Sequence, residues 1–127
     1  MTELVPYEQV LERQLRNPEF RAEWERLAPA RAVANRLVLY RAEQNLSQAA
    51  LGRRLGLSQP AVARLEAADH LPSLDTLVRI AERLGLEIVV EIVPPARHQN
   101  GHERGLPPAV TTHASTSGGA ELTVAIR

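Results

Sequence analysis

The segment from Gln48 to Ala67 limits what this chain can fold into more than any other part of the sequence. Its pattern predicts two short helices that meet at Gly56, because glycine adopts the left-handed backbone that ends a helix without strain. Gly52 provides a small residue where the two helices must approach each other. The apolar residues that would hold the second helix in place are Leu51, Leu55, Val62 and Leu65. Two short helices joined in this way form a helix-turn-helix.

Capping residues place the ends of these helices and of the one that follows. Ser47 and Ser58 precede the two helices, and serine is a preferred N-cap residue. Pro60 falls in the first turn of the second helix, where its missing N–H costs no hydrogen bond. Ser73 and Gly85 bound a further helix through residue 84. We expect this helix to present one apolar face, made of Leu74, Leu77, Val78, Ala81 and Leu84.

Two helices are predicted before residue 30 and a third directly after it. The first covers 6–16. The second starts at Asn17, another good N-cap, and ends or is interrupted at Pro29. Phe20, Trp24 and Leu27 recur at helical spacing and form an apolar stripe on it. The third helix covers 30–43.

In the C-terminal part of the chain, the spacing of apolar residues changes from helical to alternating. Residues 86–93 alternate in side-chain type, which predicts a strand, and Pro94-Pro95 end it. Residues 96–120 are rich in Pro, Gly, Ser, Thr and His, as flexible linkers are. Residues 121–127 alternate again and form either a second strand or a frayed tail.

These patterns predict a mainly α fold, a helix-turn-helix bundle with an N-terminal helical arm and a C-terminal strand. We expect the arm at 1–29, the DNA-binding domain at 30–85, a strand for dimerisation at 86–93, and a flexible tail with a possible terminal strand at 94–127. The strand could pair with its twofold mate, as a dimer on a palindromic site requires. It could instead pair with Leu122–Ile126 of the same chain. That pairing would need a connection of nearly thirty residues, and such long loops are uncommon.

Composition argues against several other classes of protein. The chain has no cysteine, which excludes disulfides and thiolate chemistry. It carries no phosphate-binding glycine loop, nucleophile elbow or zinc-protease motif, so we expect neither an enzyme nor a cofactor. His98, His102 and His113 lack metal-ligand spacing. Without a signal peptide or a long apolar run, we expect a cytoplasmic protein with no membrane contact.

Charge is uneven along the chain although its sum is zero. Residues 1–29 hold four Arg and six Glu, a balance of −2. Residues 30–70 hold six Arg and three acids, a balance of +3, and residues 71–127 hold five Arg and six acids, a balance of −1. The positive excess therefore lies around the helix-turn-helix, where a polyanion would bind.

The central segment resembles the phage-repressor (Cro/cI, or XRE-like) family of helix-turn-helix proteins over about residues 37–84. Two further parts of the chain match the family pattern. They are Arg41 followed by Leu46-Ser47-Gln48, and Leu65-Glu66 followed by Leu71-Pro72-Ser73-Leu74. The resemblance implies that Arg41 and Glu66 form an ion pair inside the domain.

The chain departs from the family pattern at two positions. Gly52 stands where the family usually has alanine, which should weaken its helix by up to about 1 kcal/mol. Pro60 stands at a recognition position that is often polar, so one polar base contact would be replaced by an apolar one.

The second helix of such a motif places its N-terminal residues against base edges in the major groove. Glutamine can bind adenine and arginine can bind guanine, each through two hydrogen bonds, while small apolar residues can contact a thymine methyl group. The expected base contacts are Ser58, Gln59, Pro60, Ala61 and Arg64. The expected phosphate contacts are Gln48, Arg53 and Arg54. The two arginines could alternatively be no more than a solvated surface.

The order of arm, helix-turn-helix and strand resembles antitoxins of the HigBA type. That resemblance implies neutralisation of a RelE-like toxin by direct binding, and repression of the shared operon by a dimer on operator DNA. Phe20 and Trp24 are the candidate toxin-binding residues, since aromatic side chains are favoured interface anchors. They could instead cover the core of their own domain. The alternative function is a stand-alone repressor without a toxin.

Overall fold

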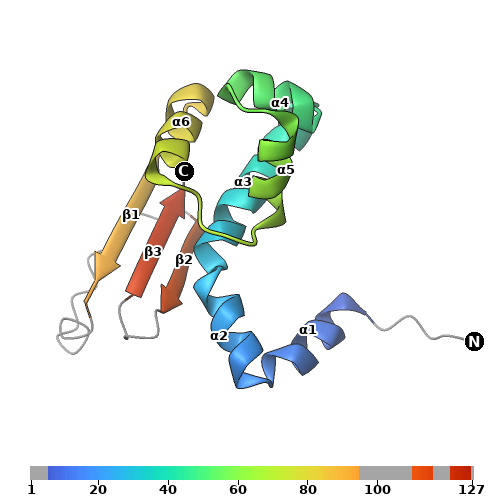
Figure 1. Cartoon of the computed structure of the whole chain (residues 1–127), viewed down its shortest axis with the longest axis vertical. Coiled ribbons are helices and arrows are strands. Elements are labelled where there is room, and N and C mark those ends of the chain that lie inside the picture. Colours follow the sequence, from blue (N-terminus) through green and yellow to red (C-terminus); the bar gives the residue numbers. More distant parts are fainter. Residues whose placement is uncertain (1–5, 95–109, 116–120, 127) are drawn as a thin grey trace, which may run out of the picture.

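The computed structural model describes residues 6–94, 110–115 and 121–126, and shows a mainly helical molecule with one small sheet. The elements in order are α1 (Tyr7–Leu15), α2 (Pro18–Arg26), α3 (Ala28–Gln44), α4 (Gln48–Leu55), α5 (Gln59–Ala67), α6 (Leu74–Leu84), β1 (Ile88–Val93), β2 (Val110–Ser115) and β3 (Glu121–Ile126). In Figure 1, α3 lies between the α4–α5 pair and the sheet, while α1 and α2 project from its lower end. The fold class expected from the sequence is confirmed.

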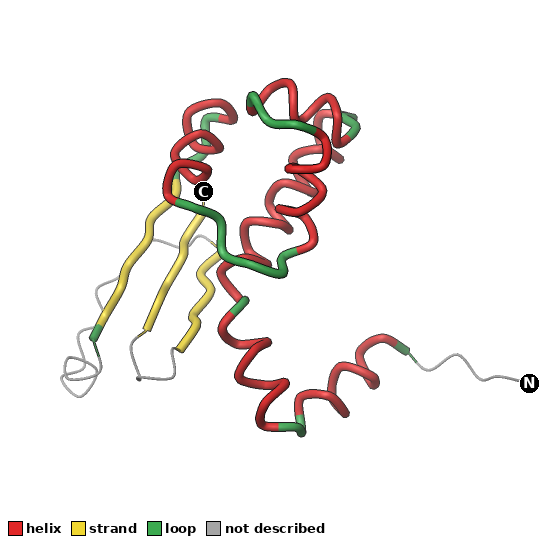
Figure 2. Tube along the Cα trace, viewed as in Figure 1, coloured by secondary structure: helices red, strands yellow, loops and turns green. Residues whose placement is uncertain are grey.

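The helices begin and end at the capping residues that the sequence predicts. Ser47, Ser58 and Ser73 each accept a hydrogen bond on Oγ from the backbone N–H three residues later, at 3.0, 3.3 and 3.2 Å. Gly56 and Gly85 end α4 and α6 with φ of 69° and 67°. A side chain would be strained in this left-handed backbone. The tube in Figure 2 shows the resulting short loops between successive helices.

Pro29 begins a helix where the sequence predicted that it would end or interrupt one. α2 already ends at Arg26, and α3 starts at Ala28 with Pro29 in its first turn. An N–H there would have no helical acceptor, so proline costs nothing and its fixed φ suits the helix. Pro29 therefore helps to start the longest helix of the described chain.

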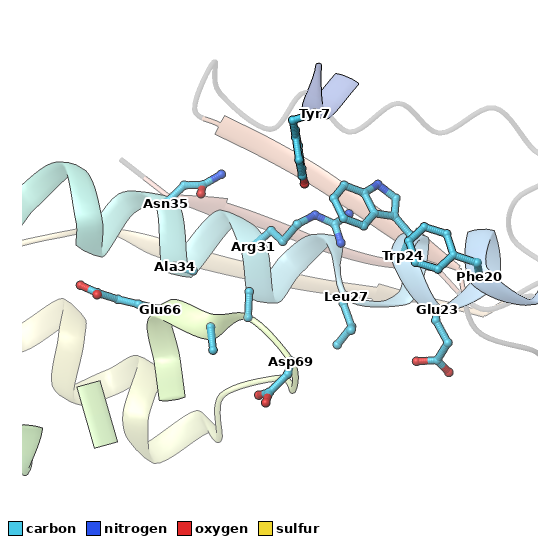
Figure 3. Close-up of a pocket in the computed structure, with 12 residues that line it drawn as sticks. Tyr7, Phe20, Glu23, Trp24, Leu27, Arg31, Ala34, Asn35, Glu66 and Asp69 are labelled. Carbon is cyan, nitrogen blue, oxygen red and sulfur yellow. The ribbon is translucent and has the colours of Figure 1, made fainter. Parts of the chain in front are cut away.

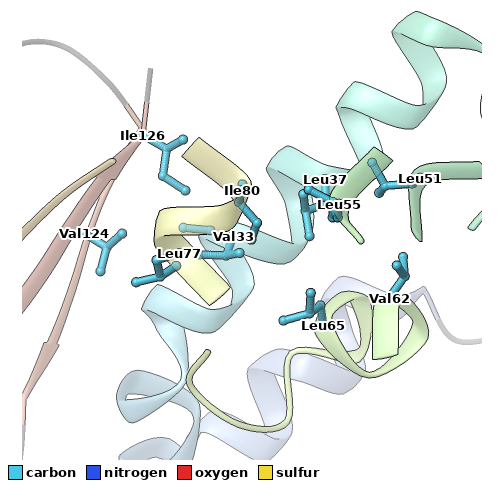
Figure 4. Packing of buried hydrophobic residues seen from close by; sticks show 11 residues of the cluster. Val33, Leu37, Leu51, Leu55, Val62, Leu65, Leu77, Ile80, Val124 and Ile126 are labelled. Atoms are coloured by element: carbon cyan, nitrogen blue, oxygen red, sulfur yellow. The ribbon is translucent and has the colours of Figure 1, made fainter. Parts of the chain in front are cut away.

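The core joins the helices to the sheet. Leu37, Leu51, Leu55 and Val62 are fully buried, and Val124 and Ile126 of β3 belong to the same cluster (Figure 4). Burying such side chains is worth about 1.5–3 kcal/mol each. The helical bundle and the sheet therefore share one hydrophobic core.

Only part of the apolar face predicted for α6 is buried. Leu77 and Ile80 point into the core (Figure 4), whereas Leu74 and Val78 are 71% and 54% exposed. The apolar stripe is wider than the surface that the core offers to α6, so its flank stays in solvent. Leu74 and Val78 therefore belong to the apolar face of α6 but lie outside the core.

The sheet has the strand order β1-β3-β2, with both pairs antiparallel. β1 thus pairs with β3 of its own chain, for example Ile88 with Ile126 and Ile92 with Leu122. The alternative in which β1 pairs within its own chain is therefore correct, and the connection is not structureless because it contains β2. Residues 121–126 form the strand that was one of the two alternatives for the C-terminal segment, whereas the strand at 110–115 was not predicted. Each of these strands pairs its backbone hydrogen-bonding groups with a neighbouring strand.

The remaining predictions concern histidines, membrane-spanning helices and metal sites, and they can be examined only in the residues that the structure describes. His98 and His102 lie outside the described residues. Within the described part of the chain, no helix is long and apolar enough to cross a membrane. The same part holds no cluster of three or more metal-binding side chains.

Candidate nucleic-acid interface

The turn between α4 and α5 is held tightly at the protein backbone. Leu57 N–H donates to Gly52 O at 2.8 Å. A Cβ added to Gly52 would lie 2.5 Å from the Leu57 carbonyl oxygen, closer than real Cβ atoms come. Glycine at this position is therefore required by the close approach of the turn, which explains the departure from the usual alanine.

Arg79 of α6 secures the same turn from the other side. Its Nη1 donates to Gly56 O at 2.9 Å and lies 3.5 Å from Leu55 O. These carbonyls end α4 and have no partner within the helix. Arg79 was not predicted to contact this turn, because no local signal connects it to a residue 23 positions earlier in the chain.

α5 presents its N-terminal side to solvent. Gln59, Pro60 and Arg64 are exposed, while Val62 and Leu65 face the core on the opposite side. Ser58 is also exposed, and its hydroxyl caps the helix. Ala61 is half-buried at the edge of the exposed face. Four of the five residues expected to contact bases therefore lie at the start of this helix, with Ala61 the least accessible, while Arg64 lies in its last turn.

A chain of polar contacts connects α3, α4 and α5. Arg41 donates from Nε to Glu66 Oε1 at 2.6 Å and from Nη2 to Glu66 Oε2 at 3.1 Å. Gln48 Nε2 also donates to Glu66 Oε2, at 2.6 Å, and Gln59 Nε2 donates to Gln48 Oε1 at 2.8 Å. We call these four residues the Glu66 network.

The Glu66 network has a nearly buried anion at its centre. The Glu66 side chain is 8% exposed and that of Arg41 is 24% exposed. The hydrogen bond with Glu66 raises the pKa of the Arg41 guanidinium, more than burial lowers it. The structure thus brings Arg41 and Glu66 together. Gln48, which was expected to contact a phosphate, accepts a hydrogen bond from Gln59.

Arg53 and Arg54 are both exposed at the end of α4. Arg54 Nη1 donates to the Tyr40 hydroxyl at 2.8 Å, and its guanidinium lies 5.9 Å from the centre of the Tyr40 ring. Arg54 is therefore oriented by α3. No such contact orients Arg53 among the residues that the structure describes.

The aromatic residues of the arm are not part of the main core. Phe20 and Trp24 are half-buried and stack on each other, with ring centres 6.2 Å apart and planes at 21°. Arg31 covers the Trp24 ring, with its guanidinium carbon 3.6 Å from the ring centre. This cation–π contact was not predicted, although Arg31 follows Trp24 by seven positions, two turns further along the chain.

Comparison with known proteins identifies the family. The sequence signature described as Helix-turn-helix matches residues 37–90. An uncharacterized HTH-type transcriptional regulator of Methanocaldococcus jannaschii is 37% identical over 56 residues, which cover 44% of this chain and 85% of that protein. The chain belongs to the helix-turn-helix family. It carries a DNA-binding domain of the XRE type.

This helix-turn-helix protein is also similar to two antitoxins. Antitoxin HigA1 from two strains of Mycobacterium tuberculosis is 33% identical over 78 residues, or 60% of this chain. The chain spans about half the length of these antitoxins, 52%. No solved structure matches the chain.

Proposed function

We propose that this helix-turn-helix protein binds operator DNA sequence-specifically through the N-terminal side of α5. The observation that carries the proposal is the Gln59 side chain, which is exposed yet held by Gln48. A side chain ordered before binding loses less conformational entropy when it contacts a base.

The remaining hydrogen-bonding groups of the Gln59 amide match those of adenine. Gln59 donates one Nε2 hydrogen to Gln48. The second Nε2 hydrogen would be donated to N7 of an adenine, and Oε1 would accept from its N6 amino group. Arg64 lies on the exposed side of the same helix and could bind guanine O6 and N7. Pro60 and Ala61 would contact a thymine methyl group, and Ser58 a neighbouring base or its sugar.

Three residues would bind the DNA backbone. Gln48 retains one Nε2 hydrogen for a phosphate after donating the other to Glu66. Arg53 and Arg54 would each neutralise a phosphate and release a counterion. Replacing either arginine by glutamine should lower the slope of log K against log salt by about 0.9 for each bound protomer, or roughly 1.8 for the proposed dimer, without changing which sequence is preferred. An unchanged slope would assign that arginine to the solvated surface instead.

We further propose that the protein is an antitoxin that binds a RelE-like toxin through its arm. The support is the similarity to the HigA1 antitoxins together with the position of Phe20 and Trp24 outside the main core. Aromatic residues on a projecting helix are suited to enter a groove of a protein partner.

A homodimer would form through β1. This strand pairs with β3 on one side only, so its other edge has no partner in the described structure. Ile92 on it is 72% exposed, and long apolar edge strands are usually covered. An antiparallel pair of β1 strands about a twofold axis would extend the sheet across both copies. Val90→Lys together with Ile92→Lys should shift the protein to monomer in sedimentation, and a stable dimer would contradict this interface.

The test of the proposed function is co-purification with the product of the neighbouring gene, followed by a mobility-shift assay on the shared promoter. Gln59→Ala combined with Arg64→Ala should abolish the shift and leave the partner bound. Phe20→Ala combined with Trp24→Ala should release the partner, keep the shift and restore toxicity in cells. A promoter shift with no partner would favour the stand-alone repressor, and no shift with any promoter DNA would contradict operator binding.

A further inference from the structure

A pocket lies between the N-terminal arm and the C-terminal end of α5 (Figure 3). Its volume is about 450 Å³, within the range of roughly 300–1,000 Å³ that is typical of small-molecule sites. Tyr7, Phe20 and Trp24 contribute aromatic surface to it, and Glu66 and Asp69 line the opposite side. Its walls therefore come from α1, α2, α3 and the end of α5.

Arg31 is the cation of this pocket. Its side chain is half-buried against the Trp24 ring, and it makes no hydrogen bond or ion pair with any residue that the structure describes. Burial lowers the pKa of the Arg31 guanidinium from its ordinary value, and the nearby Tyr7 hydroxyl opposes this shift. Half-buried charges are normally paired, because desolvation of a lone charge is costly.

The acids that line the pocket are all used by other partners. Glu23 accepts a hydrogen bond from Arg26 at 2.8 Å, and Asp69 lies 2.6 Å from His70 Nδ1. Glu66 is occupied within the Glu66 network. The pocket thus combines aromatic walls with one guanidinium whose N–H donors have no acceptor in the described chain.

We propose that this pocket binds a small aromatic carboxylate. The carboxylate would accept two parallel N–H bonds from Arg31, the geometry in which guanidinium and carboxylate interact most strongly. The ring of the ligand would pack against Tyr7 and Trp24, since offset stacking and edge contacts between aromatic rings are favourable. The site goes beyond operator and toxin binding and requires neither.

A ligand in this pocket would lie beside the C-terminal end of α5. Glu66 lines the pocket and also orders Gln48, which in turn holds Gln59. A bound ligand would therefore lie beside the residue at the centre of the Glu66 network. This is the location expected of a site for an effector of DNA binding.

The test uses Trp24, the only tryptophan of the chain, as a fluorescence reporter. The protein alone, without DNA or partner, is titrated with phenylacetate and in parallel with phenylacetamide, its neutral analogue of the same shape. Phenylacetate should change the Trp24 emission saturably. Phenylacetamide should bind about ten- to hundredfold more weakly, the loss expected when hydrogen bonds to a charged group lose one charge.

Variants of Arg31 identify the group that recognises the carboxylate. Arg31→Gln should weaken phenylacetate binding to the level of phenylacetamide, and Arg31→Lys should retain part of the affinity. Arg21→Gln is the matched control, because Arg21 is an exposed arm residue paired with Glu25 and lies outside the pocket. Equal affinity for the two probes, or no saturable change with either, would overturn the proposal even if Arg31→Gln fails to fold. So would binding that survives in a folded Arg31→Gln protein, whatever the outcome of the DNA and partner assays.

Discussion

Gly52 shows how one missing side chain sets the geometry of the DNA-binding turn. In a free helix, Gly52→Ala would stabilise by up to about 1 kcal/mol. Here the new Cβ would meet the Leu57 carbonyl oxygen at 2.5 Å, and overpacking of a rigid backbone contact costs about 1–3 kcal/mol. We therefore expect Gly52→Ala to lower the free energy of unfolding in urea by about 1 kcal/mol or more and to weaken DNA binding. A variant more stable than the parent would contradict the close approach.

A second prediction at the level of single residues concerns the effect of Glu66 on stability. Replacing it with glutamine leaves the Arg41 charge without its anion and gives Gln48 a weaker acceptor. Breaking a fully buried pair costs about 3–5 kcal/mol, and because Arg41 keeps access to water we expect about 2 kcal/mol for Glu66→Gln. Glu23→Gln is the control, since its pair with Arg26 is exposed to solvent and exposed ion pairs contribute little to stability. Urea denaturation of both variants measures the difference, and equal losses would show that the network adds no stability.

At the scale of elements, the arm and the bundle should respond differently to the loss of a helix cap. Asn17 Oδ1 accepts from Glu19 N at 3.0 Å, and Ser73 Oγ accepts from Thr76 N at 3.2 Å. Either change to alanine should cost about 1 kcal/mol of helix stability. For Asn17→Ala we expect faster amide exchange and trypsin cleavage in α2 alone, because α2 has no fully buried residue. For Ser73→Ala we expect a lower global unfolding free energy, and a global effect of Asn17→Ala would mean that the arm folds with the core.

At the scale of the whole molecule, the sheet and the helical bundle should unfold together. Ile126 of β3 is 5% exposed and lies in the cluster that contains Leu37 and Leu77. Ile126→Ala should therefore cost about 2–5 kcal/mol in a single urea transition. Leu74→Ala, on α6 and 71% exposed, should change stability by no more than about 0.5 kcal/mol. Two separate transitions, or equal effects of the two variants, would contradict the shared core.

Features that depend on neighbouring residues could be predicted from the sequence. The caps at Ser47, Ser58 and Ser73 and the left-handed ends at Gly56 and Gly85 act within one helical turn, so spacing alone reveals them. The helix-turn-helix could be predicted for the same reason. The resemblance to the phage-repressor family added the Arg41–Glu66 pair, which no local pattern indicates.

Contacts between segments far apart in the sequence became known only from the fold. β1 and β3 have similar alternating patterns, and nothing in either reveals that they pair or that β2 completes the sheet. The same holds for Gln48 within the Glu66 network, for Arg79 at the Gly56 turn and for Arg31 above Trp24. Each of these contacts depends on how elements pack in space. Periodicity along the chain records which face of an element is apolar, but not which partner covers it.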